Sequence, residues 1–112
     1  MPALLSRSRQ IAEQNQLPLA ALVRSSGFVL AALLPPANDA VTLRRLATAA
    51  NEFLRAADDF SARAMIEWCP AELKREINVW GPARGDFALM CNLKSEFDPR
   101  GILSPGRFYG GL

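Results

Sequence analysis

The sequence has no histidine and only two cysteines, Cys69 and Cys91. The lack of histidine excludes Ser–His and Cys–His nucleophile pairs and most zinc sites. The two cysteines do not stand in a CxxC spacing, and we interpret them as reduced core residues of a cytoplasmic protein. A self-contained hydrolytic or zinc site is therefore not expected.

Long apolar runs and strong net charge are also missing. The apolar run at 28–34 ends at two prolines, whereas a membrane helix needs about twenty apolar residues. The N-terminal stretch carries Arg7 and Arg9 among polar residues, which does not fit a signal peptide. A net charge of +2 is too small to indicate nucleic acid or an anionic membrane. We expect neither a membrane span nor a nucleic-acid partner.

Phosphate-binding loops are absent as well, because the sequence has no G-x-G-x-x-G and no P-loop spacing. A flavin enzyme holds the pyrophosphate with backbone N–H groups of a glycine-rich loop. We therefore predict no autonomous active site, no catalytic residue and no metal ligands in this chain. The candidates for polar contacts are Lys94, Arg100, Ser104 and Arg107.

What is present is typical of one small α+β domain, since the chain has 112 residues and half are apolar. Apolar residues spaced three and four apart predict helices over 2–15, 42–57 and 86–97. Asn38 or Asp39 can cap the second of these, and Asp86 the third. A short helical turn is expected over 71–77.

Three segments predict a small sheet. The runs at 19–24 and 28–34 flank Ser25-Ser26-Gly27, which favours a β-hairpin, although one buried helix is an alternative. Residues 62–68 alternate between apolar and polar, as a half-buried strand does. With the helix between them, 28–34 and 62–68 would form a right-handed β-α-β unit. The expected architecture is about three strands packed with helices.

The last sixteen residues, 97–112, are interrupted by prolines and glycines, so neither a helix nor a strand is expected to run through them. Disordered tails are normally poor in apolar residues, yet this stretch contains six. They are Phe97, Ile102, Leu103, Phe108, Tyr109 and Leu112. We predict a strap that lies against a surface, and that this surface belongs to a body outside the chain.

The same stretch carries a family resemblance. The run FDPRGILSPGR at 97–107, with Lys94 before it, resembles the C-terminal signature of FAD-linked oxidases of the vanillyl-alcohol-oxidase type. The ending GRFYGG, together with Val79-Trp80-Gly81-Pro82 upstream, is most similar to the FAD-binding E subunit of bacterial glycolate oxidase. Residues 18–70 resemble the cap domain of the family in element order. The family usually has asparagine at the position of Ser104.

The resemblance implies a division into residues 1–97, a ferredoxin-like cap-domain portion, and residues 98–112, a strap that returns to a flavin domain absent from this chain. It implies FAD as a cofactor that is bound mainly by that domain, with Ser104 and Arg107 as candidate cofactor-binding residues. The implied partners are that domain or other oxidase subunits, and the implied substrate is a small 2-hydroxy acid such as glycolate. The chain alone is expected to be inactive.

Other interpretations remain open at this stage. From the residues alone we favour an ordinary interdomain or surface ion pair for Arg107 over a ligand contact, a turn before Pro105 for Ser104, and a core position for Trp80 over a flavin wall. The whole chain is also compatible with a stand-alone α+β interaction module that docks through its apolar strap, since exposed apolar patches mark contact sites, or with an inactive remnant.

Overall fold

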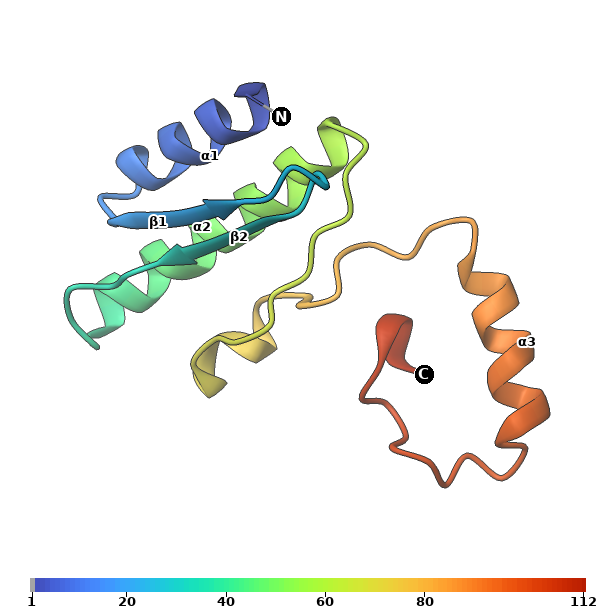
Figure 1. The fold of residues 1–112 in the computed structure, drawn as a ribbon. Helices are drawn as coiled ribbons and strands as arrows, with labels where there is room; N and C mark the ends of the chain where they lie inside the picture. The colour runs from blue at the N-terminus through green and yellow to red at the C-terminus, as the bar shows by residue number, and fades with distance from the viewer. Residues whose placement is uncertain (1) are drawn as a thin grey trace.

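A computed structural model describes residues 2–112 and has a small α+β fold (Figure 1). This confirms the predicted fold class. The elements in order are helix α1 (Pro2–Gln14), strands β1 (Leu19–Val23) and β2 (Val29–Leu33), helix α2 (Ala40–Asp59), the 3-10 turn η1 (Ala71–Arg75), helix α3 (Phe87–Phe97) and the 3-10 turn η2 (Tyr109–Gly111).

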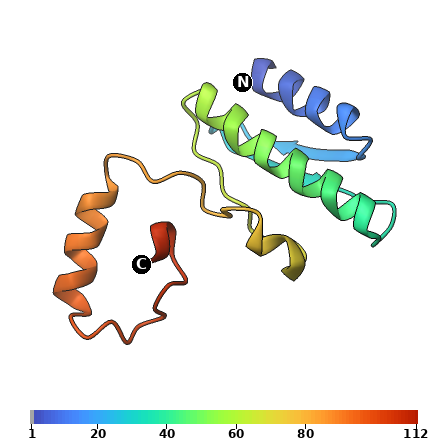
Figure 2. The same cartoon turned by 180° about the vertical axis from the view of Figure 1, so that it is seen from behind.

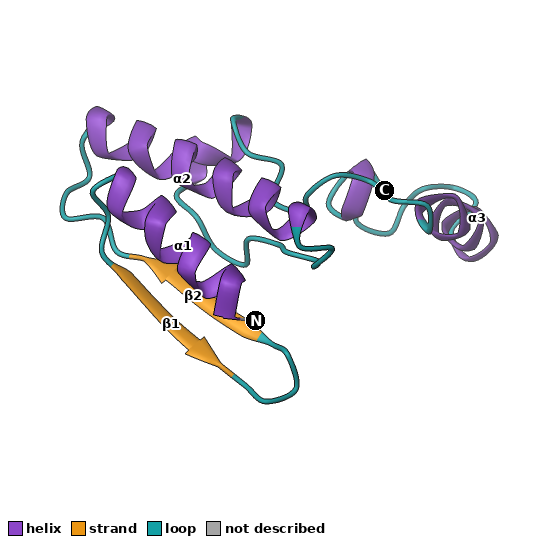
Figure 3. Cartoon of the chain, turned by 90° about the horizontal axis from the view of Figure 1, so that it is seen from above, coloured by secondary structure: helices purple, strands orange, loops and turns teal. Residues whose placement is uncertain are grey.

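The predicted hairpin is present, which excludes the alternative of one buried helix. β1 and β2 pair antiparallel, with Leu19 opposite Leu33 and Val23 opposite Val29. Because side chains alternate along a strand, Leu22 and its partner Leu30 lie on the face opposite to these pairs. Seen from above, α1 and α2 lie together over one side of the hairpin (Figure 3).

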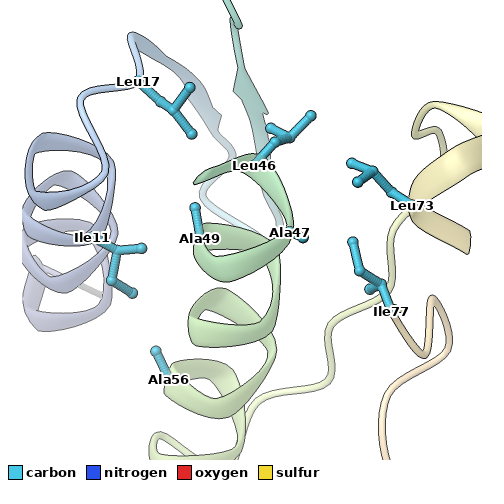
Figure 4. Packing of buried hydrophobic residues seen from close by; sticks show 8 residues of the cluster. All are labelled: Ile11, Leu17, Leu46, Ala47, Ala49, Ala56, Leu73 and Ile77. Carbon is cyan, nitrogen blue, oxygen red and sulfur yellow. The ribbon is translucent and has the colours of Figure 1, made fainter. Parts of the chain in front are cut away.

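The hydrophobic core lies between the two long helices and extends to η1 (Figure 4). Ile11 of α1 is completely buried and faces Ala49 and Ala56 of α2, whose small side chains allow the helices to approach closely. Leu73 and Ile77 close the core from the other side of α2. This packing gives the N-terminal part of the chain its own core.

Asp39 caps α2, as predicted. Its carboxylate accepts hydrogen bonds from the backbone N–H of Thr42 at 2.7 Å and from the Thr42 hydroxyl at 3.1 Å. These bonds favour the ionised carboxylate and lower the pKa of Asp39. Two of the polar groups at the start of the helix are thereby paired.

The predicted third strand over 62–68 is wrong, and so is the β-α-β unit built on it. No strand forms at 62–68, and the sheet of residues 2–112 has two strands. The backbone N–H of Ile66 donates to the carbonyl of Val79 at 2.7 Å, so this segment contacts the chain before Trp80 rather than β2. Trp68, expected on the buried side, is 81% exposed.

Two smaller predictions about helix ends also need correction. Asp86 makes no capping hydrogen bond at the start of α3: Oδ2 of its carboxylate pairs with the guanidinium of Arg63, and Oδ1 has no partner within residues 2–112. Its backbone, at φ −78° and ψ −8°, is helical rather than extended as a capping residue usually is. The short turn after Pro70 ends at Arg75, two residues before the predicted end.

The C-terminal part forms a separate lobe: α3 and the following chain stand away from the α1–β1–β2–α2 layer (Figures 1 and 2). The radius of gyration is 15.9 Å, against about 13 Å for a compact chain of this length. α3 has no fully buried residue. Within residues 2–112, no helix is long and apolar enough to cross a membrane.

Candidate functional site

The strap, residues 98–112, begins with a turn that is fastened by Asp98. The Asp98 carboxylate accepts hydrogen bonds from the backbone N–H groups of Ile102 at 3.0 Å and Leu103 at 2.9 Å. Lys94 Nζ donates to the same carboxylate at 2.5 Å and to the Leu103 carbonyl at 2.7 Å. Asp98 is buried. The Lys94 and Asp98 of the resemblance motif therefore set the direction in which the strap leaves α3.

This pairing shifts the titration of Asp98. The Lys94 ammonium and the Leu103 N–H stabilise the carboxylate and lower its pKa from 3.8 to about 2. In an unfolded chain the pKa of aspartate is about 3.9. Since the folded value is the lower one, the contribution of Asp98 to strap stability is complete above about pH 4 and is lost as the pH falls toward 2.

We expect the amide resonances of Ile102 and Leu103 to titrate with a midpoint near the pKa of about 2. The measurement is an acid titration followed by NMR, with Asp98→Asn as the control, in which this titration should be absent. A midpoint near 4 would mean that neither Lys94 nor the N–H groups of Ile102 and Leu103 bind the Asp98 carboxylate.

The end of the strap is anchored on its own chain. The Tyr109 hydroxyl donates to the Pro82 carbonyl at 2.8 Å and accepts from the Arg84 backbone N–H at 2.7 Å. Its ring packs edge-to-face on Phe87, with centroids 5.6 Å apart. Tyr109 is thus buried against the corner after Trp80, whereas we expected the strap to lie against a body outside the chain.

Trp80 belongs to the same anchor. Its ring meets Phe108 edge-to-face at a centroid distance of 5.0 Å. Arg84 ties the corner to the end of α2 by donating to the Asp58 carboxylate at 2.8 Å and to the Ala62 carbonyl at 2.7 Å. These contacts favour the packing interpretation of Trp80.

Ser104 and Arg107, the two residues that the resemblance implies for cofactor binding, lie in one turn of the strap. The Ser104 carbonyl accepts from the Arg107 backbone N–H at 3.2 Å. Both residues are exposed, and neither side chain makes a hydrogen bond or ion pair within residues 2–112. The structure therefore brings the two together without giving either side chain a partner.

Ser104 has a left-handed backbone conformation, with φ of 45°. Among residues other than glycine, asparagine and aspartate adopt this region most readily, and β-branched residues adopt it rarely. An asparagine would therefore fit the backbone at position 104 better than serine does, independently of any contact its side chain makes.

We expect Ser104→Asn to leave the strap as stable as before or stabilise it by a few tenths of a kcal/mol, and Ser104→Val to destabilise it by about 1 kcal/mol. Hydrogen exchange of the Arg84 amide, which bonds to Tyr109, reports strap anchoring. Equal protection in the valine and asparagine variants would contradict the backbone explanation.

A groove of about 500 Å³ separates α3 from the strap. Its apolar lining comes from Met90, Leu93 and Phe97 of α3 and from Leu103, Phe108 and Leu112 of the strap. Lys94 and Ser104 are its polar lining residues. Sequence reasoning missed this groove, because it exists only through the return of the strap to the Trp80 corner.

Two apolar surfaces are bare. In the strap, Ile102 and Leu103 are 63% and 62% exposed. On the hairpin, the cross-strand pair Leu22 and Leu30 is exposed together with Phe28. An antiparallel sheet that faces water normally shows polar residues there, so this hairpin face has the composition of a covered surface.

Within the described residues no three side chains are grouped so as to hold a metal ion. The chain matches no protein-family model, no curated protein and no solved structure. Functional assignment therefore depends on the strap and on the surfaces just described.

Proposed function

We propose that this chain is the cap-and-strap part of a cytoplasmic, FAD-linked 2-hydroxy-acid oxidoreductase of the glycolate oxidase type. The complete enzyme would oxidise a 2-hydroxy acid to the 2-oxo acid and pass two electrons through FAD to an acceptor. A flavin domain outside the chain would hold FAD, and the strap, with Ser104 and Arg107, would lie at the seam between the two parts.

The observation that carries the proposal is the exposed apolar segment after the Asp98 turn. Lys94 and Asp98 of the motif build a fixed turn, and this turn presents Ile102 and Leu103 to solvent. Two large aliphatic side chains held in water are unfavourable, and a second surface that covers them removes their apolar area from water and stabilises the complex. The unpaired side chains of Ser104 and Arg107 on the same strap are available to a ligand or domain at that surface.

A second candidate is a non-enzymatic interaction module that docks on a partner through the strap. The anchoring of Tyr109 on the chain's own corner favours it, because the strap then has a defined shape without any second domain. The two candidates differ in whether a flavin-binding sequence precedes residue 1.

The test is to express the chain alone and together with the reading frame that precedes it. We expect the long form to show flavin absorbance that bleaches when glycolate or another 2-hydroxy acid is added, and the chain alone to show none. If the long form carries no flavin, the oxidase proposal fails. A ribosome-binding site directly before Met1, with no upstream frame, would favour the interaction module.

A matched pair of variants tests the seam in the long form. Ile102 of the strap and Val41 of α2 are both exposed aliphatic residues, at 63% and 56%. Ile102→Asp should lower the flavin content several-fold, because it places a charge in the covered surface. Val41→Asp should leave the flavin content unchanged. Equal effects of the two substitutions would show that the strap does not form the seam.

A further inference from the structure

We propose that the open face of the hairpin is a dimer interface, and that it packs against the same face of a second copy of this chain. The open face is the side of β1 and β2 that is turned away from α1 and α2 (Figure 3). This inference concerns the hairpin and does not rest on the oxidase proposal, which places its seam at the strap.

The open face consists of four cross-strand rows. Leu33 packs against the core, and side chains alternate along a strand, so the even-numbered residues of the hairpin point away from the helices. At the two ends of the hairpin, the Leu34 N–H donates to the Pro18 carbonyl and the Arg24 N–H to the Phe28 carbonyl, both at 2.9 Å. The rows, all exposed, are Pro18–Leu34, Ala20–Ala32, Leu22–Leu30 and Arg24–Phe28.

The order of the rows lets the face fit a copy of itself. Of the two inner rows, one holds the small residues Ala20 and Ala32, and the other holds the large residues Leu22 and Leu30. A twofold axis between the two sheets, running across the strands midway between these rows, places each leucine row over the alanine row of the other copy. Layers of protein pack well when large side chains face small ones. A twofold contact of this kind also closes on itself and gives a dimer rather than an open-ended assembly.

The charge on the face is compatible with this arrangement. Arg24 is the only charged residue in the four rows, and it lies in an end row. The twofold axis places it over Pro18 of the other copy, three rows away from the second Arg24. With rows about 6.8 Å apart, the two guanidinium groups lie roughly 20 Å from each other, well beyond the Debye length of about 8 Å. Repulsion between them is therefore screened. An anionic lipid surface, by contrast, attracts clusters of about four or more basic residues, which this face lacks.

The exposed area predicts a weak dimer. Leu22, Phe28, Leu30 and Leu34 are each between 45% and 54% exposed. With the smaller residues between them they offer roughly 400 Å² per copy and about 800 Å² per dimer, less than the roughly 1,200–2,000 Å² of stable complexes. We therefore expect a dissociation constant on the order of 100 µM, so that the chain is monomeric when dilute and dimeric near millimolar concentration.

Sedimentation equilibrium of the chain between about 5 µM and 1 mM measures this association. We expect a monomer–dimer equilibrium without larger species. Leu22→Lys should weaken dimerisation at least tenfold, because it places a charge in the contact. The matched control is Val41→Lys on α2, where the native side chain is 56% exposed against 54% for Leu22. It should leave the dissociation constant unchanged.

Ala32→Leu separates the proposed fit from unspecific apolar contact. The substitution makes the face more apolar, yet it fills the row that receives the leucines of the other copy. Since overpacking of this kind is unfavourable, we expect dimerisation to weaken about tenfold. An unchanged or stronger association would overturn the packing of leucine rows on alanine rows.

Ala21→Pro distinguishes the open face from the strand edge. Ala20 and Leu22 form the rows whose backbone groups bond to β2, so the N–H of Ala21 between them points out of the free edge of β1. Proline is tolerated at such edge positions, and we expect the dimer to persist. Loss of the dimer in this variant, with an unchanged circular dichroism spectrum, would assign the contact to pairing of strand edges instead. A chain that stays monomeric at 1 mM, growth beyond the dimer, or equal effects of Leu22→Lys and Val41→Lys would also overturn the proposal.

Discussion

Replacing Ile11 by alanine should lower the free energy of unfolding of the N-terminal layer by about 3 kcal/mol, within the roughly 2–5 kcal/mol seen for such core truncations. Ile11 is the largest side chain in the described chain that is fully buried. It fills the space between α1 and α2 opposite Ala49 and Ala56, whose methyl groups are too short to close a cavity. The neighbouring side chains therefore cannot fill the cavity that Ile11→Ala leaves, and the full loss of stability is expected.

The matched control for this prediction is Ile102→Ala, the same chemical change at a strap position that is exposed. It should change the free energy of unfolding by less than about 0.5 kcal/mol, as surface substitutions do. Urea unfolding followed by far-UV circular dichroism measures both variants. Equal losses would mean that Ile102 is covered in solution, which would itself indicate self-association.

The N-terminal layer was predictable because its signals are local. Apolar periodicity placed α1 and α2 within two residues of their ends, the Ser25-Ser26-Gly27 loop indicated the hairpin, and Asp39 capped α2 as expected. At the far end, α2 continues two residues beyond the predicted Ala57. Asp58, which the helix dipole disfavours at that position, has Arg84 as a partner from a distant part of the chain.

The errors occurred where partners are distant in sequence. The alternating pattern at 62–68 satisfies the rule for a strand, but a strand also needs a neighbouring strand edge, and Ile66 finds Val79 instead. Likewise Asp86 is a good capping residue by type, yet one of its carboxylate oxygens pairs with Arg63, 23 positions away, and its backbone is helical instead of extended. The composition of a segment does not reveal such competing partners.

In the candidate site, too, the features that depend on local composition were predictable, and the contacts between distant residues were not. The Pro- and Gly-interrupted strap was expected from composition, and its exposed Ile102 and Leu103 agree with that expectation. The bonds of Tyr109 to Pro82 and Arg84 were not foreseen, because they join residues 25 and more positions apart. A tyrosine that follows several glycines gives no signal of the partner to which its hydroxyl bonds.

The anchor formed by Tyr109 should fail when Gly110 is replaced by alanine. Gly110 has φ of 65°, a region that costs other residues about 1–2 kcal/mol. A Cβ there would also lie 3.1 Å from Phe87 Cδ2 and closer still to Cε2 and Cζ. We expect a total loss of about 3 kcal/mol in strap anchoring, from the backbone and from steric overlap together. Exchange of the Arg84 amide should accelerate about a hundredfold.

Gly101→Ala separates the two causes. Gly101 has a similar φ of 62°, but a Cβ built there meets no atom within 4 Å. This variant should show the backbone cost alone, about 1 kcal/mol. If the two alanine variants accelerate Arg84 exchange equally, Phe87 swings aside freely and the overlap contributes nothing.

A double substitution tests whether Phe87 is the obstacle. Phe87→Ala alone should weaken the anchor, because it removes the edge-to-face contact with Tyr109. Once the ring is gone, adding Gly110→Ala should cost no more than Gly101→Ala does in the native background, since only the backbone term remains. A full additional loss of about 3 kcal/mol in the double variant would mean that the added methyl group at position 110 overlaps atoms other than the Phe87 ring. The strap would then pack against the corner in an arrangement different from the one described here.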